Sequence, residues 1–417
     1  MTSGPYGIFI VCCAALTFIS PLLSLYLFVL VSPLAALNEA LGWDPRTAWA
    51  VVLCIRGLWE CWDTGSSYLP KNTTAIWVSL TAILIGELRF TATGLLPDDM
   101  EAAWSMLLYF VAGSCAIYGI WQLIRAKRQL HILFRVFATS VLIASTIGLV
   151  EALMKYHLGS PTDRISGPLG NPNYYATYLA LAATILVQLI RFGGLNRIYG
   201  WLVCAVAALA CALTLSRTGI MALSLGVTLA LLIRPGAKIL SARTIAVAGG
   251  AVLLAGLLIA GYLLDYRRSL TFSDDPRQTG LAEGAQAAED LSRLQAFRYS
   301  VELTAENPVT GVGFGTFQAR NYNANGLYVT THDTVMEILV GSGLIGATLF
   351  LWLLLSLIRP LQLSSRRCLF PSAVALGVCS LFGDYLQSIE LFVIFAILYL
   401  YARDVKPADI MSVSGAT

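Results

Sequence analysis

Long apolar runs recur along the entire chain and are separated by short polar or basic stretches. Because an α-helix needs roughly 20 mostly apolar residues to span a bilayer, each such run predicts one span. Pro21 interrupts the first run and divides it into two predicted helices. The pattern therefore predicts an all-α, polytopic transmembrane helical bundle of about 12 spans. The predicted spans cover residues 6–20, 22–38, 73–92, 102–124, 131–153, 173–191, 197–214, 217–233, 244–264, 333–358, 369–384 and 386–402.

One further stretch, residues 46–62, combines tryptophans with Arg56 and Glu60, and Asp63 follows it. A helix with one apolar and one charged face is typical of the membrane interface. We therefore expect this segment to lie at the interface rather than to span.

Lys and Arg gather at one side of the predicted bundle. Cytoplasmic loops are enriched in these residues, so this side is predicted to face the cytoplasm. The opposite, extracytoplasmic side then receives segments 93–101, 154–172 and 265–331 and the turn at Ser216–Arg217. The basic clusters are Arg125, Lys127 and Arg128; Arg191 and Arg197; Arg234, Lys238 and Arg243; Arg359, Arg366 and Arg367; and Arg403 and Lys406.

This topology divides the chain into four parts. Residues 1–264 hold about nine spans, 265–331 form one large periplasmic loop, 332–402 hold about three spans, and 403–417 form a cytoplasmic tail. The loop contains eight acidic and six basic residues, so it is not a polybasic tail.

The second half of the long loop predicts a helix. Leu294, Phe297, Val301 and Leu303 recur at helical spacing and predict one apolar face, and Pro308 ends the pattern. The glycine-rich sequence VTGVGFGTF follows and is interpreted as a turn, because it lacks the preceding strand of a dinucleotide-binding fold.

Composition agrees with a membrane protein. Apolar residues make up 57% of the chain, and 12% of residues are charged, whereas soluble domains carry roughly 25% charged residues. A net charge of +3 does not favour a nucleic-acid partner. All nine cysteines lie in or beside apolar segments, so we expect free thiols and no disulfide framework. The first six residues lack a cationic leader region, which predicts that the first apolar helix is retained.

Two polar clusters lie at the predicted extracytoplasmic ends of spans. In the sequence RISGPLGNPNYYA, Arg164 precedes a helix that Asn173 is well placed to cap. In the short turn LSRTG, Ser216 and Arg217 lie between two strongly apolar helices. A guanidinium group can bind a phosphate through two parallel hydrogen bonds, so Arg217 is a candidate anion ligand; an interfacial, snorkelling arginine is the alternative.

Two more clusters belong to the long loop and to the span after it. Arg293 and Arg298 lie on the predicted loop helix, and either could be a phosphate ligand or pair with nearby Glu289 or Glu302. His332 lies where the loop returns to the membrane. Histidine titrates near neutrality and can remove a proton from a hydroxyl, so His332 is a candidate general base; a capping or interfacial histidine is the alternative.

The segment after His332 is also polar at its start. Asp333 and Glu337 lie in its first turns, and Gly343 and Gly346 would allow close helix approach. The three histidines are scattered and no HxxH or CxxC spacing occurs, which argues against a metal centre. The sequence also contains no Walker A motif for binding nucleotide phosphates.

Taken together, the four clusters resemble the O-antigen ligase and polymerase superfamily of bacterial envelope glycosyltransferases. The resemblance runs from about residue 130 to 400 and depends on RISGPLGNPNYYA, LSRTG, RLQAFRYSVELTAENPVTGVGFGTF and HDTVMEILVGSGLIG. The last sequence resembles the ligase pattern of His, then Asn, Ser or Gln, then nine residues and GxxG. Asp333 departs from that pattern at its second position.

The resemblance implies a GT-C-like bundle in the bacterial inner membrane with cytoplasmic termini and an active site that faces the periplasm. It implies an undecaprenyl-diphosphate-linked glycan as donor, lipid A-core as acceptor, and no metal or nucleotide cofactor. Arg217 and Arg293 would bind the diphosphate, with Arg164 as a third candidate, and His332 would be the base. Asn173, Ser216, Asp333, Arg298 and Glu337 are possible supporting residues.

Two other functions stay open. An O-antigen or exopolysaccharide polymerase would use the same carrier with a different acceptor. A transporter or flippase for lipid-linked glycans belongs to another class, and would need ionisable residues at broken midplane helices.

Overall fold

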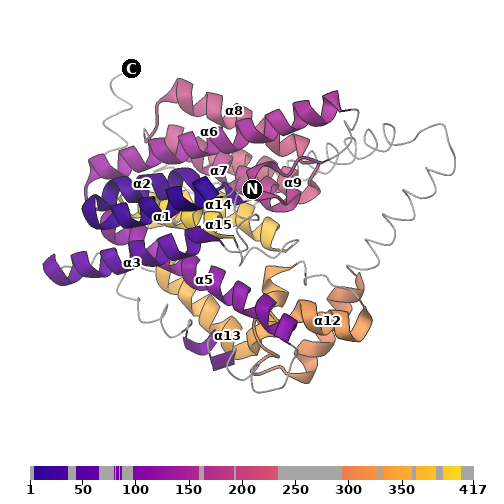
Figure 1. Cartoon of the computed structure of the whole chain (residues 1–417). Helices are drawn as coiled ribbons and strands as arrows, with labels where there is room; N and C mark the ends of the chain where they lie inside the picture. The colour runs from indigo at the N-terminus through magenta and orange to yellow at the C-terminus, as the bar shows by residue number, and fades with distance from the viewer. Residues whose placement is uncertain are drawn as a thin grey trace, which may run out of the picture.

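The computed structural model describes residues 4–35, 44–64, 79, 81–83, 85–86, 97–158, 164–191, 194–232, 294–326, 331, 333–358, 363–381 and 388–404. This part of the chain is helical and contains no strand, as the apolar runs predict. Figure 1 shows the helices as one bundle, with α6 and α8 side by side and α12 and α13 in the lower part of the view. The helices are α1 (Gly4–Ile19), α2 (Pro21–Val31), α3 (Pro45–Thr64), α5 (Pro97–Leu123), α6 (Lys127–His157), α7 (Pro172–Arg191), α8 (Arg197–Leu213), α9 (Arg217–Leu232), α12 (Phe317–Asn325), α13 (Thr334–Ile358), α14 (Leu363–Ser380) and α15 (Ile389–Asp404).

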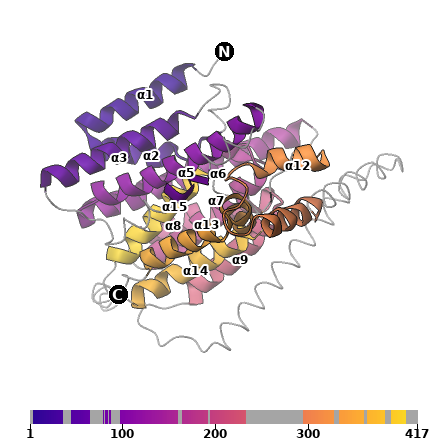
Figure 2. The same cartoon turned by 90° about the horizontal axis from the view of Figure 1, so that it is seen from below.

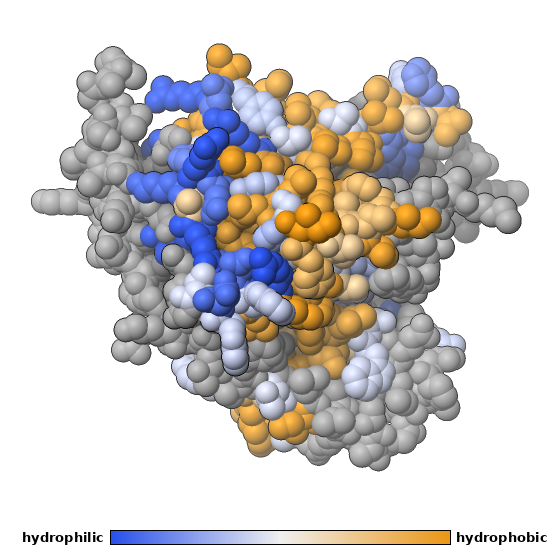
Figure 3. Space-filling view, turned by 60° about the vertical axis from the view of Figure 1, so that its left-hand side comes forward, coloured by the Kyte–Doolittle hydropathy of each residue, from blue (hydrophilic) through white to orange (hydrophobic). Residues whose placement is uncertain are grey.

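Among the described residues, four helices are long and apolar enough to cross a membrane: Ala103–Leu123, Lys127–His157, Pro172–Arg191 and Thr334–Leu353. Figure 3 shows a broad apolar surface beside a group of hydrophilic side chains, as expected for a protein surrounded by lipid. The predicted span 244–264 and most of span 73–92 lie outside the described residues, so the predicted number of about 12 spans stays a prediction.

The first apolar run is divided as predicted. α1 ends at Ile19 and α2 begins with Pro21, which lacks an N–H and is well suited to a first helical turn. Ser24 donates to the carbonyl of Cys13 (2.8 Å), so the chain reverses between the two helices.

Helix α3 covers the segment 46–62 that is predicted to lie at the membrane interface. It is not among the described helices that are long and apolar enough to cross a membrane, and its place at the interface stays a prediction. Leu53 packs on Gly119 of α5, and Cys61 donates to Gln122 (2.9 Å), so α3 runs beside α5 in the same direction. Figure 2 shows α1, α2 and α3 as neighbouring ribbons at one side of the bundle. Of the charged residues that suggested an interface, Arg56 and Glu60 form an ion pair with each other.

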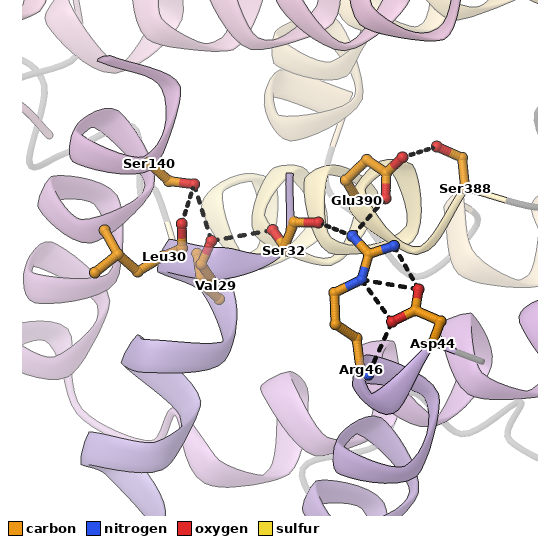
Figure 4. Close-up of polar contacts among 8 residues, drawn as sticks. All are labelled: Val29, Leu30, Ser32, Asp44, Arg46, Ser140, Ser388 and Glu390. Carbon is orange, nitrogen blue, oxygen red and sulfur yellow. Dashed lines mark hydrogen bonds and ion pairs between the residues drawn. The ribbon is translucent and has the colours of Figure 1, made fainter. Parts of the chain in front are cut away.

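A buried ionic cluster joins α2, α3 and α15 (Figure 4). Arg46 contacts Asp44 through Nε at 2.9 Å, the carbonyl of Ser32, and Glu390 at 3.4 Å. The side chains of all three charged residues are at most 4% exposed. Ser388 donates to Glu390 at 2.6 Å. A buried charge must be compensated, so this cluster fixes how the three helices meet.

Helix α7 forms the centre of the bundle. Every residue from 175 to 190 is buried. A Cβ atom on Gly219 of α9 would lie 2.4 Å from Ala176 Cβ, and one on Gly226 would lie 2.4 Å from Thr184 Oγ1. These close contacts show that α9 packs along α7 in the same direction, so both helices begin at the same end of the bundle.

Candidate functional site

The first part of the candidate site is the loop that leads into α7. Asn171 caps this helix, because its Oδ1 accepts from the backbone N–H groups of Asn173 (2.9 Å) and Tyr174 (3.3 Å). The prediction that Asn173 is the cap was therefore wrong by two residues. The capping oxygen must come from the residue that precedes the helix, and here Pro172 occupies the first helical position.

Asn173 instead connects two segments that are far apart in the sequence. Its Oδ1 accepts from Arg164 (2.5 Å) and from Ser216 Oγ (3.2 Å). Arg164 also donates through Nε to the carbonyl of Thr214 (2.9 Å), at the end of α8. The structure thus brings Arg164, Asn173 and Ser216 together, although the sequence presented them as two separate clusters.

The turn between α8 and α9 presents Arg217. Leu215 has φ 51°, a left-handed conformation that costs a non-glycine residue roughly 1–3 kcal/mol. Ser216 then caps α9 by accepting from the N–H of Gly219 (3.3 Å). Arg217 is the first residue of α9; its side chain is exposed and has no hydrogen bond or ion pair with the described residues.

Two helices therefore start beside this arginine. α7 and α9 begin at the same end of the bundle, and the Asn173–Ser216 hydrogen bond joins their first turns. The first N–H groups of α7 already bind Asn171, so the contribution of the two N-termini is a positive partial charge that favours an anion. The arrangement suits a phosphate group held by the Arg217 guanidinium.

Sequence reasoning missed the group that anchors this loop. Glu151, near the end of α6, accepts from the N–H groups of Ser166 (3.2 Å) and Gly167 (2.6 Å). Lys155 pairs with Glu151 at 2.8 Å and donates to the carbonyl of Arg164 at 2.6 Å. The spacing of an acid four residues before a lysine was the available signal, but the sequence does not reveal which loop the pair holds.

The second part of the candidate site is the start of α13. Asp333 caps this helix, since its Oδ1 accepts from the N–H groups of Val335 (2.7 Å) and Met336 (3.1 Å). Glu337, one turn further, is 3% exposed. His332 and Arg293 lie outside the described residues. The predicted convergence of Arg217, Arg293 and His332 therefore stays a prediction.

The predicted loop helix is present at residues 294–306, but its buried face differs from the predicted one. Leu303 is buried as predicted, whereas Leu294, Phe297 and Val301 are exposed. Ala296 instead packs with Leu303 against Phe317 of α12 and Val340 of α13. Arg298 is exposed.

Helix α13 is broken at Gly343, which has φ 61° and ψ −163°; the sequence predicted a continuous span. The segment 308–313, which overlaps the predicted glycine-rich turn, lies across the break and satisfies the backbone groups that the break releases. Val312 and Gly313 donate to the carbonyls of residues 340 and 341 (2.8 and 2.9 Å), and residues 344 and 345 donate to those of 308 and 309 (2.8 and 3.1 Å). This strap, residues 308–313, fixes helix 294–306 to α13.

A comparison with known protein families gives a match for the middle of the chain. A family model described as O-antigen ligase matches residues 202–351, which include the Arg217 turn, the strap and the start of α13. No curated protein matches the chain.

Proposed function

We propose that the chain is an O-antigen ligase of the O-antigen ligase/polymerase superfamily, because a family model described as O-antigen ligase matches residues 202–351. It transfers a glycan from undecaprenyl diphosphate to a sugar hydroxyl of lipid A-core, at the periplasmic face of the bacterial inner membrane. The transfer is metal-independent and inverts the anomeric centre.

The observation that carries this proposal is the exposed guanidinium of Arg217 beside the first turns of α7 and α9. The leaving group of the reaction is a lipid diphosphate, and charge develops on it as the glycosidic bond breaks. Positioned donors stabilise such charge most in a low-dielectric site. Arg217 is proposed to bind this diphosphate, and Ser216 supports it by capping α9.

The Arg164 guanidinium is already bonded to Asn173 and to the carbonyl of Thr214. We therefore propose that Arg164 and Asn173 mainly hold the Ser216 turn in position, and that Arg164 is an additional phosphate contact. Arg293 is the proposed second diphosphate ligand, and Arg298 lies five residues further along the same segment.

His332 is proposed to take the proton from the acceptor hydroxyl. Asp333, which caps α13, fixes the backbone next to His332. Direct attack by the activated hydroxyl on the anomeric carbon, with departure of the diphosphate, inverts the configuration. Glu337 is buried one turn further along α13 and is proposed to support this region.

A polymerase of the same superfamily remains the alternative, because the two activities differ only in the acceptor. A transporter is disfavoured by the break in α13. In transporters, broken helices leave backbone groups for the substrate, whereas here the strap already satisfies them at Val340, Gly341, Leu344 and Ile345.

Reconstitution of the purified chain with lipid-linked donor tests the proposal. Rough lipopolysaccharide as acceptor should give a ladder on a gel, whereas a lipid-linked repeat unit as acceptor should be extended only by a polymerase. Arg217→Ala and His332→Ala should each lower transfer by about 100-fold or more, and Arg217→Lys should retain part of it. Full activity of either alanine variant, in protein that elutes and unfolds like the wild type, would refute the mechanism.

A further inference from the structure

A stripe of basic side chains lies at the opposite end of α6 from Glu151. Lys127, Arg128, His131 and Arg135 are all exposed. Their spacing, at positions i, i+1, i+4 and i+8, places them on one face of the first turns of α6. The proposed transfer reaction uses none of them.

Arg197, at the start of α8, lies at a similar level of the bundle to this stripe. Thr139 of α6 and Tyr199 of α8 are hydrogen-bonded at 2.9 Å. Arg135 lies one turn before Thr139 and Arg197 lies two residues before Tyr199, so the two arginines reach a similar level on neighbouring helices, which run side by side in Figure 1. Arg197 is also exposed, and Asn196 caps α8 beside it by accepting from Tyr199 N–H (3.1 Å).

The three arginines of this group are not neutralised within the described part of the protein. Arg128, His131, Arg135 and Arg197 form no ion pair with a described residue. Both α6 and α8 begin here, and the positive ends of the two helices add to the field of the side chains. The patch therefore attracts anions.

The same faces become apolar further along both helices. On α6 the basic stripe is continued by the exposed side chains Ile143, Val150 and Leu153, and on α8 Trp201 and Leu202 are exposed beyond Arg197. A soluble phosphate would match only the charged part of this surface. A phospholipid would match both parts, with its phosphate at the arginines and an acyl chain along the apolar side chains.

We propose that the α6–α8 basic patch, formed by Lys127, Arg128, His131, Arg135 and Arg197, binds an anionic phospholipid of the surrounding leaflet. The arginines bind the headgroup phosphate through charge-assisted hydrogen bonds. Trp201, at the boundary, suits the interfacial region of the bilayer. This inference is independent of the proposed transferase activity.

Native mass spectrometry of the detergent-purified full chain tests the proposal. Phosphatidylglycerol and cardiolipin should bind and raise the thermal midpoint, whereas phosphatidylcholine and inorganic phosphate should not. The triple variant Arg128→Gln, Arg135→Gln and Arg197→Gln should weaken the binding of anionic lipid on the order of a hundredfold, because each basic residue near such a surface contributes roughly a fivefold factor.

A matched variant separates charge from packing. Replacing the same three arginines by lysine keeps the charge and should retain most of the binding. Binding to the wild-type chain should also weaken as salt is raised, since these charges are exposed. Equal affinity of the glutamine triple variant, equal binding of phosphatidylcholine, or binding that does not respond to salt would overturn the proposal.

Discussion

Gly167 lies against the ring of Tyr175, so close that a Cβ atom on Gly167 would come within 2.6 Å of Cε1 and Cζ. Tyr175 is fully buried and its hydroxyl donates to the carbonyl of Ala144 (2.8 Å). The ring therefore cannot move aside easily. The loop that carries Arg164 is held between this ring and the carboxylate of Glu151.

Gly167→Ala should displace this loop and impair transfer. The position combines φ +56° with a steric clash, so we expect a loss of about 2–4 kcal/mol in the free energy of unfolding and a lower rate of transfer. Gly326→Ala is the matched control, because Gly326 has φ +68° but no atom within 4 Å of the added Cβ. Unfolding in mixed micelles measures both; equal losses would mean that the contact with Tyr175 contributes nothing.

Glu151→Gln should reduce transfer through the geometry of the loop. The substitution removes the charge that pairs with Lys155 and weakens the acceptor for the N–H groups of Ser166 and Gly167. Because Arg164 lies two residues before Ser166, we expect the diphosphate site to loosen and the KM for lipid-linked donor to rise about 5- to 30-fold, which corresponds to roughly 1–2 kcal/mol in binding. Lys155→Met, which removes the other partner, should act in the same direction. An unchanged KM in both variants would contradict the anchoring role.

Gly343→Ala should disrupt the strap across α13. An added Cβ would lie 2.5 Å from backbone atoms of Val309 and Gly311, which cannot move as a flexible side chain can. We expect a loss of about 3 kcal/mol or more, since up to four backbone hydrogen bonds would be strained. Gly377→Ala in α14 is the control; it has open space around it and should be neutral or slightly stabilising because alanine favours helix. Thermal unfolding of the two variants in detergent compares them directly, and similar midpoints would mean that the strap does not stabilise the break in α13.

The apolar runs were sufficient to predict most helices. The predicted ranges 102–124, 173–191, 197–214 and 217–233 agree closely with α5, α7, α8 and α9, because lipid requires long apolar helices and the loops between them are short. The packing of α3 was less predictable. Arg46 of α3 contacts Asp44, two residues before it, and also Glu390, 344 residues away, and no local pattern reveals the second of these partners.

The candidate site was predictable in its parts but not in its assembly. Arg164, Asn173 and Ser216 stood out as polar residues at helix ends, but their hydrogen bonds depend on α9 packing along α7. In the same way, the sequence suggested a turn in the glycine-rich segment after Pro308 and close packing at Gly343. It did not show that this segment lies across the break at Gly343. A long-range partner must be known before either role can be assigned.

The Arg46 cluster gives the last prediction. Arg46→Met should leave Asp44 and Glu390 buried without their cation, and breaking a buried pair in this way costs roughly 3–5 kcal/mol. Arg56→Met removes an arginine from the same helix. The side chains of Arg56 and its partner Glu60 are 20% and 24% exposed, and pairs that water reaches contribute roughly 0–1 kcal/mol. The triple variant Asp44→Asn, Arg46→Met and Glu390→Gln removes all the charges together, so it should recover part of the stability lost by Arg46→Met. Free energies of unfolding from titration with SDS in mixed micelles decide the matter: a loss no greater than that of Arg56→Met would mean that the cluster does not hold α2, α3 and α15 together.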